Sequence, residues 1–229
     1  VTPGLRAIRA PEVWYQLGYN GAGRLVGSCD TGVMGGHVAL ATRWRGYQGA
    51  NPWQECWLDV LGGGTQSPSD GNGHGTHTTG TMVGLGAGTQ DTIGVAWGAQ
   101  WIASNVINQG VGSGFDNDVI ASFQWFTDPD GNPNTVDDVP DVVQNSWGVY
   151  EGLGYPDCHT LWYSVIDNCE AAGVVSCWSA GNEGPSSGSH RSPADRATTT
   201  LNTFSVGAVS AQSGQSFPYN IASFSSRGP

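Results

Sequence analysis

Apolar runs and amphipathic stretches alternate along this chain. Five short segments are rich in apolar residues, as buried strands are, and they are residues 24–29, 100–107, 140–148, 173–182 and 202–210. Four segments fit a helical pattern, and they are residues 9–18, 75–85, 115–126 and 159–173. Strands separated by helices of about ten to fifteen residues favour βαβ units, so the pattern predicts a parallel sheet covered on both faces.

The order of these segments predicts one α/β domain over residues 1–229, with three layers built on a doubly wound, mostly parallel sheet. Residues 46–73 and 183–200 are predicted to be long polar loops. Ligand sites in such sheets lie beyond the carboxyl ends of the strands. Three short sequences follow predicted strands and mark the candidate site: CDTG (29–32), NSWG (145–148) and SAGN (179–182).

Composition narrows the classes of partner. Eight basic against nineteen acidic residues give a net charge of −11, which argues against nucleic acid and anionic membranes as partners. No apolar run approaches the roughly 20 residues of a membrane span. The five cysteines are an odd number and form no C-x-x-C pair, so they leave the redox compartment open. The low charge and the Gly/Ser-rich composition favour an extracellular protein.

Asp30 closes the first predicted strand and therefore lies at the ligand edge of the sheet. One interpretation is a residue that caps the following turn. Another is the Asp-Thr-Gly signature of aspartic proteases, but those enzymes need two such carboxylates sharing a proton, and this chain has one such triplet. A third is a carboxylate that orients a catalytic histidine.

Two histidines, His74 and His77, stand three residues apart in GNGHGTHTTGTMVG (71–84). Zinc-binding helices of the His-Glu-x-x-His type place the histidines four apart with a glutamate between, which differs from this pattern. Capping of a helix start is a second interpretation. A general base needs a neutral imidazole oriented by a carboxylate, and Asp30 is a candidate for that carboxylate.

Five motifs occur in the order found in subtilisin-like serine peptidases. They are VGSCDTGV (26–33), GHGTHTTGTMVG (73–84), VVQNSWG (142–148), SAGNEGP (179–185) and IASFSSRGP (221–229). Nearly the whole chain resembles this subtilase family, and most closely its bacillopeptidase F type. The resemblance implies a peptidase acting on protein or peptide substrates outside the cell, with no cofactor needed for the chemistry.

The resemblance also assigns roles to particular residues. Asp30 matches the orienting carboxylate, His74 the general base, and Asn182 the asparagine whose amide stabilises the oxyanion. His77 is then expected to be a structural histidine within the helix.

Two segments match the strands between which an extended substrate lies: Gly112, Ser113 and Gly114, and Ser146, Trp147 and Gly148. We expect the bulky Trp147 side chain to shape a substrate pocket.

One departure from the family pattern concerns the nucleophile. The family's serine lies in a Gly-Thr-Ser-Met-Ala-like motif beyond SSRGP, and this sequence ends at Pro229. We therefore expect the domain to lack its C-terminal portion, the chain alone to be inactive, and a separate C-terminal fragment to be a candidate partner that carries the serine. The alternative function is a non-catalytic module that binds extended peptides.

A further acidic stretch, DPDGNPNTVDD (128–138), is a candidate for structural calcium. Asp128, Asp130, Asn132 and Asn134 occupy alternate positions and offer the oxygen ligands that calcium prefers. The Asp-Gly and Asn-Pro pairs fit a solvated turn equally well, and the terminal glutamate of an EF-hand is absent.

Overall fold

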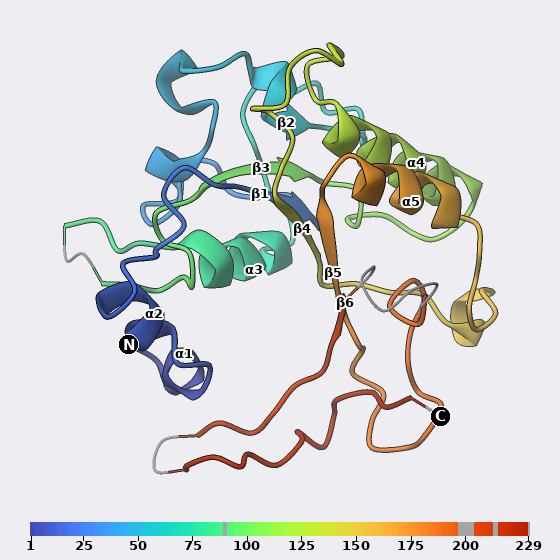
Figure 1. Cartoon of the computed structure of the whole chain (residues 1–229). Helices are drawn as coiled ribbons and strands as arrows, with labels where there is room; N and C mark the ends of the chain where they lie inside the picture. The colour runs from blue at the N-terminus through green and yellow to red at the C-terminus, as the bar shows by residue number, and fades with distance from the viewer. Residues whose placement is uncertain (89–90, 197–203, 213–214, 229) are drawn as a thin grey trace.

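A parallel sheet forms the centre of the protein (Figure 1). The structure is a computed structural model and describes residues 1–88, 91–196, 204–212 and 215–228. Within them the sheet has six strands in the order β2-β3-β1-β4-β5-β6. The strands are β1 (Leu25–Cys29), β2 (Trp57–Leu58), β3 (Gln100–Ser104), β4 (Val142–Asn145), β5 (Val175–Ser179) and β6 (Phe204–Val206). Every neighbouring pair runs parallel.

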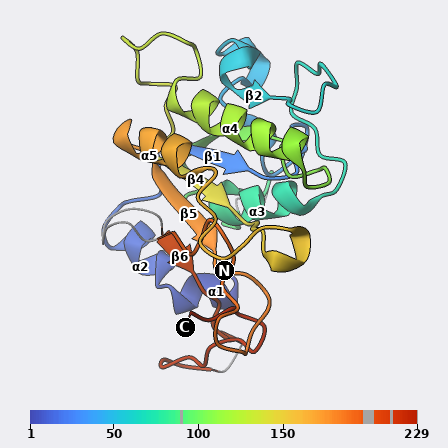
Figure 2. The same ribbon diagram turned by 90° about the vertical axis from the view of Figure 1, so that its right-hand side faces the viewer.

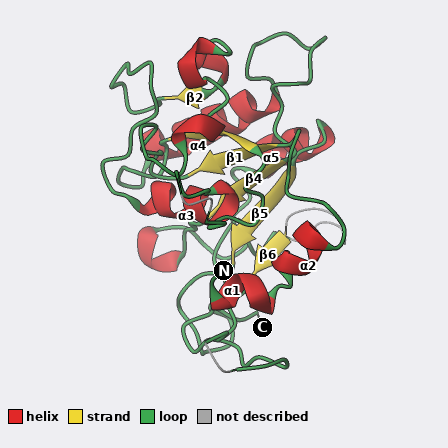
Figure 3. Ribbon diagram, turned by 90° about the vertical axis from the view of Figure 1, so that its left-hand side faces the viewer, coloured by secondary structure: helices red, strands yellow, loops and turns green. Residues whose placement is uncertain are grey.

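Helices cover both faces of the sheet (Figures 2 and 3). Helices α4 (Ser113–Thr127) and α5 (Tyr163–Ala171) lie side by side on one face, and α3 (His74–Val83) lies on the other. The short helices α1 (Pro3–Ala7) and α2 (Ala10–Tyr15) form a small separate core with Trp97. Four 3-10 turns complete the elements of the described residues: η1 (Ala41–Arg43), η2 (Tyr47–Gly49), η3 (Trp53–Glu55) and η4 (Glu151–Leu153).

Alternation along β1 shows how the sequence creates two cores. Leu25 and Cys29 belong to the core beneath α4 and α5, whereas Val26 belongs to the core on the opposite face. Successive strand residues point to opposite faces, so a continuous apolar run supplies both. The predicted doubly wound, three-layer α/β fold is confirmed.

Several predicted boundaries differ from the structure. Strand β2 lies inside residues 46–73, which the sequence predicts to be a loop, and helix α1 precedes the predicted first helix. Helix α5 begins at Tyr163 rather than at residue 159. Of the predicted strand 202–210, the structure forms β6 and an isolated bridge from Val209 to Ile221, and residues 202–203 lie outside the described residues. No helix in the described part of the chain has the length and apolarity to cross a bilayer.

Candidate active site

The candidate site lies at the carboxyl edge of the sheet. Asp30 follows β1, and Asn182 lies three residues beyond the end of β5. Strand β4 lies between β1 and β5, so these two chain segments are separated by two strand spacings, about 10 Å. The edge predicted from the sequence is therefore where the structure places both residues.

Asp30 and His74 form a direct hydrogen bond. Asp30 is fully buried, and its Oδ1 lies 2.7 Å from Nδ1 of His74 and accepts the backbone N–H of Thr31 at 2.7 Å. Its Oδ2 accepts the Thr78 hydroxyl at 3.2 Å and the Gln144 amide at 3.4 Å. These donors replace the water that a buried carboxylate loses, so Asp30 is held in one orientation.

The outer edge of the His74 ring is open. The His74 side chain is 47% exposed, and its Nε2 accepts no hydrogen bond from any residue that the structure describes. An ionised carboxylate only accepts hydrogen bonds, so the bond to Asp30 places the ring proton on Nδ1. The Nε2 lone pair then faces outward, which is the arrangement that a general base requires.

Glycine allows helix α3 to approach the end of β1 this closely. A Cβ atom at Gly75 would lie 2.1 Å from the carbonyl oxygen of Gly32 and 3.1 Å from Cβ of Asp30. The backbone N–H of Gly75 donates to the Thr31 hydroxyl at 2.9 Å, which fixes the helix start against the strand end. The helix therefore delivers His74, its first residue, to Asp30.

Asp70 organises the start of α3, a role that the sequence interpretation missed. Its carboxylate accepts the backbone N–H groups of Asn72, Gly73 and Thr76 at 2.8–3.0 Å and the Thr76 hydroxyl at 2.6 Å. Burial alone would raise the pKa of Asp70, but these hydrogen bonds outweigh it and hold the pKa below its usual value. An aspartate just ahead of a predicted helix is a capping signal and points to this role.

Asn182 lies in a loop that an ion pair holds in place. Glu183 pairs with Arg191, and its carboxylate also accepts the Asn182 N–H at 2.9 Å and the Ser226 hydroxyl at 3.2 Å. Burial raises the pKa of Glu183, but the hydrogen bonds and charge of Arg191 lead the effects that bring it below its ordinary value. Asn182 is exposed, and its side-chain amide has no hydrogen-bond partner among the described residues.

Comparison with known proteins identifies the family. A sequence model of the subtilase family matches residues 21–229. This chain belongs to the subtilase family. It is 40% identical to bacillopeptidase F of Bacillus subtilis (strain 168) over 183 residues, which cover 76% of this chain and 12% of that protein. It is 33% identical to subtilisin DY of Bacillus licheniformis over 230 residues, which cover 98% of this chain and 68% of that protein.

Solved structures agree with this assignment. The S41 psychrophilic protease superposes with a TM-score of 0.65 at 26% identity, covering 91% of this chain and 60% of that one. The chain thus spans a small part of bacillopeptidase F and about two thirds of subtilisin DY. The predicted family is confirmed, and the domain boundary of 1–229 stays a prediction.

The two predicted substrate segments of this subtilase reach the same edge as the Asp30–His74 pair. Gly112 precedes α4, and Ser113 and Gly114 are its first residues; all three are exposed. Ser146 and Gly148 follow β4 and are half-buried, and the Gly148 carbonyl accepts a hydrogen bond from Arg191 at 3.2 Å. Contact between either segment and a substrate stays a prediction.

The Trp147 side chain is largely buried. It is 8% exposed and packs edge-on against the rings of Phe115, Trp162 and Trp178, in the core beneath α4 and α5. Most of this side chain is therefore turned into the core, and the expectation that it shapes a substrate pocket stays a prediction. The Trp147 backbone still lies at the carboxyl edge.

A cavity of about 250 Å³ lies at the ends of β4, β5 and β6. Its walls come from the ends of three strands: Gln144, Asn145, Ser146, Cys177, Trp178, Ser179 and Val206. Gln144 links the cavity to the pair through its hydrogen bond to Asp30. Burial raises the pKa of the Cys177 thiol. No serine hydroxyl or cysteine thiol in the described ranges hydrogen-bonds His74.

His77 and the acidic loop complete the predicted residues. His77 lies on α3 with an exposed side chain that makes no hydrogen bond to other described residues, so nothing in its surroundings supports the expected structural role. In the acidic loop, Asp128 and Asp130 meet Asp138, whereas Asn132 and Asn134 hydrogen-bond each other.

Proposed function

We propose that this chain supplies the acid–base and oxyanion groups of a serine endopeptidase, with the attacking serine contributed from outside these 229 residues. The observation that carries the proposal is the 2.7 Å bond between buried Asp30 and His74, which leaves Nε2 of His74 open. Membership in the subtilase family supports serine peptidase chemistry at this site.

The chemistry follows from the two ring nitrogens of His74. As the serine oxygen attacks the peptide carbonyl carbon, Nε2 takes the serine proton, and Asp30 stabilises the resulting imidazolium through Nδ1–H. The Asn182 amide donates to the oxygen that becomes negatively charged. The C–N bond then breaks, His74 returns the proton to the departing amine, and water releases the acyl group by the same route.

Substrate would lie extended at the carboxyl edge, between residues 112–114 and 146–148. Main-chain hydrogen bonds would give affinity and side pockets would give preference. We further propose that the protein acts outside the cell, which is consistent with its low content of charged residues, 12%.

The test compares the two histidines in the protein that carries this chain. We expect His74→Ala to abolish hydrolysis of denatured protein and His77→Ala to leave it within about twofold, because of the two histidines His74 is the one that hydrogen-bonds Asp30. Sulfonyl fluoride reagents should inhibit the unsubstituted protein. Equal loss of activity in both variants at equal folded fraction, or inhibition by chelators alone, contradicts the proposal.

A second candidate function is a non-catalytic module that binds extended peptides. It is favoured by one observation: in the part of the chain that the structure describes, no nucleophile contacts His74. Experiments on the protein that carries this chain distinguish the two functions. A binding module retains peptide without cleaving it and does not react with sulfonyl fluorides.

A further inference from the structure

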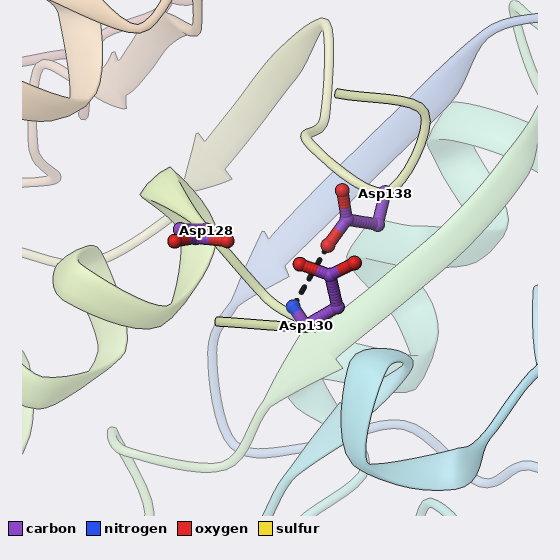
Figure 4. Close-up of side chains that lie close together, drawn as sticks. All are labelled: Asp128, Asp130 and Asp138. Atoms are coloured by element: carbon purple, nitrogen blue, oxygen red, sulfur yellow. Dashed lines mark hydrogen bonds between the residues drawn. The ribbon is translucent and has the colours of Figure 1, made fainter. Parts of the chain in front are cut away.

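Three carboxylates gather in the loop between α4 and β4 (Figure 4). Asp128 follows α4, Asp130 lies two residues on, and Asp138 lies close to the start of β4. One oxygen from each lies within 4.8 Å of the other two. The sequence pattern of alternate Asp and Asn residues does not include Asp138, which the fold brings back to the cluster from eight residues beyond Asp130.

Asp138 is buried, and one of its two carboxylate oxygens lacks a hydrogen-bond partner among the described residues. The residue is 1% exposed, and its Oδ2 accepts the backbone N–H of Asp130 at 2.8 Å. Its Oδ1 is buried and has no hydrogen-bond partner among the described residues. A buried carboxylate oxygen without a donor is costly, so this atom requires a positive or hydrogen-bonding partner that the described protein groups do not supply.

Negative charge around the cluster is poorly balanced. Glu55 and Asp137 lie nearby, and the adjacent cation Arg45 pairs with these two, at 3.9 Å and 3.0 Å, rather than with the cluster. The three clustered carboxylates therefore lie near two further carboxylates and one guanidinium group that pairs with those two, which favours a bound cation.

We propose that Asp128, Asp130 and Asp138 bind a calcium ion. Calcium takes oxygen ligands at about 2.3–2.6 Å, so two ligands of one ion lie at most about 5 Å apart, as the three oxygens here do. The ion coordinates the unpaired Asp138 oxygen and offsets the repulsion among the three carboxylates. An irregular set of loop oxygens suits calcium better than magnesium, which demands a small, regular octahedron.

The proposed ion is structural, because it lies far from the Asp30–His74 pair. Helix α4 starts at the carboxyl edge of the sheet and runs for fifteen residues to the loop, about 22 Å at 1.5 Å per residue. The ion would tie the end of α4 to the start of β4. The proposal therefore stands apart from the proposed peptidase function and is tested without measuring hydrolysis.

Calcium chloride titration of the metal-stripped protein that carries this chain tests the site. We expect one calcium ion to bind per chain by calorimetry, and the melting temperature to rise with calcium. Asp138→Asn and Asp128→Asn should each weaken binding by about tenfold or more, because the charge of the ligands sets the affinity. Asp137→Asn is the matched control: it removes the same charge from an exposed position in the same loop and should bind within about twofold of the unsubstituted protein.

A calcium site and a merely acidic loop differ in how calcium changes the order of two melting temperatures, that of Asp138→Asn and that of the unsubstituted protein. Without calcium, Asp138→Asn should melt as high as the unsubstituted protein or higher, since it removes a buried, unpaired charge; with calcium it should melt lower. The proposal is overturned by an absence of calcium binding, by Asp137→Asn weakening binding as much as Asp138→Asn, or by magnesium binding as tightly as calcium.

Discussion

Two carboxylates hold the start of helix α3, and each uses its hydrogen bonds for a different purpose. Asp30 directs its bonds toward the His74 ring, whereas Asp70 directs its bonds toward the helix backbone. Asp70 also accepts the Thr31 hydroxyl at 3.0 Å, and Thr31 in turn accepts the N–H of Gly75. Through this chain of contacts, Asp70 positions the histidine that Asp30 orients.

Replacing Asp70 with asparagine should lower stability by about 1–3 kcal/mol at neutral pH, because the amide nitrogen cannot accept the two Thr76 bonds. The pKa of Asp70 is lowered by folding, so its contribution is complete above the ordinary value of about 3.9 and is lost as pH falls through the lowered pKa. Urea unfolding at pH 7 and at about pH 3 measures both effects.

The difference between Asp70→Asn and the unsubstituted protein should therefore shrink at the acid end. Asp157→Asn, at an exposed position, is the control and should change stability by less than about 0.5 kcal/mol. A deficit in Asp70→Asn that is equal at both pH values would mean that the Asp70 charge contributes nothing.

The position of a site residue was predictable from the sequence where a local motif marks that residue. Asp30, His74 and Asn182 stand next to predicted strand or helix ends, and the structure places all three at the expected edge. Gln144 was missed because its role depends on a partner 114 positions away. Asp70 has local partners in the helix start, so its place just ahead of the predicted helix was a usable signal. The burial of the Trp147 side chain was not predictable from the motif, because it depends on ring contacts with Phe115, Trp162 and Trp178, which come from other parts of the chain.

At the scale of the elements, α3 and the end of β1 approach each other closely at the site. The end of β1 meets the first turn of α3 at Gly75, where no room exists for a side chain. Further along the same helix, a Cβ atom at Gly80 would meet nothing within 4 Å. The two glycines thus have different reasons for being present, and they make a matched pair for experiment.

Gly75→Ala should destabilise the protein by about 3 kcal/mol and sharply reduce hydrolysis, because backbone must move away from Gly32 and carry His74 with it. Gly80→Ala should stabilise it by about 0.5–1 kcal/mol, since alanine favours a helix interior, and should leave activity unchanged. Chemical denaturation and peptide hydrolysis of the two variants measure these effects. A tolerated Gly75→Ala would show that the helix start can shift without moving the histidine.

Strand and helix types followed from the pattern, but the shortest elements did not. Strand β2 is two residues long and pairs only through Trp57 and Leu58 with β3. Helix α1 depends on Thr2 as its cap and Pro3 at its first position, which is a weak signal in five residues. Such short elements form because they pair or pack with neighbouring segments. The local sequence does not reveal which segments those are.

At the scale of the whole molecule, the β6 edge of the sheet is exposed and apolar. Strand β6 forms one edge, and all three of its residues are exposed, including Phe204 and Val206. The chain after β6 extends away from the helices as a long loop, where Phe217 is 84% exposed and Phe224 is also exposed (Figure 1). An exposed apolar edge strand is a site for pairing with another chain.

The 229-residue chain expressed alone should therefore self-associate at micromolar concentration. Val206→Lys should reduce association, because a charge on an edge strand opposes strand pairing. Val38→Lys is the matched control: Val38 is 71% exposed but lies outside the sheet, so the same substitution should leave association unchanged. Light scattering coupled to size-exclusion chromatography gives the mass of each species. A chain that stays monomeric without substitution, or that Val38→Lys disperses as well as Val206→Lys does, would show that the β6 edge does not drive association.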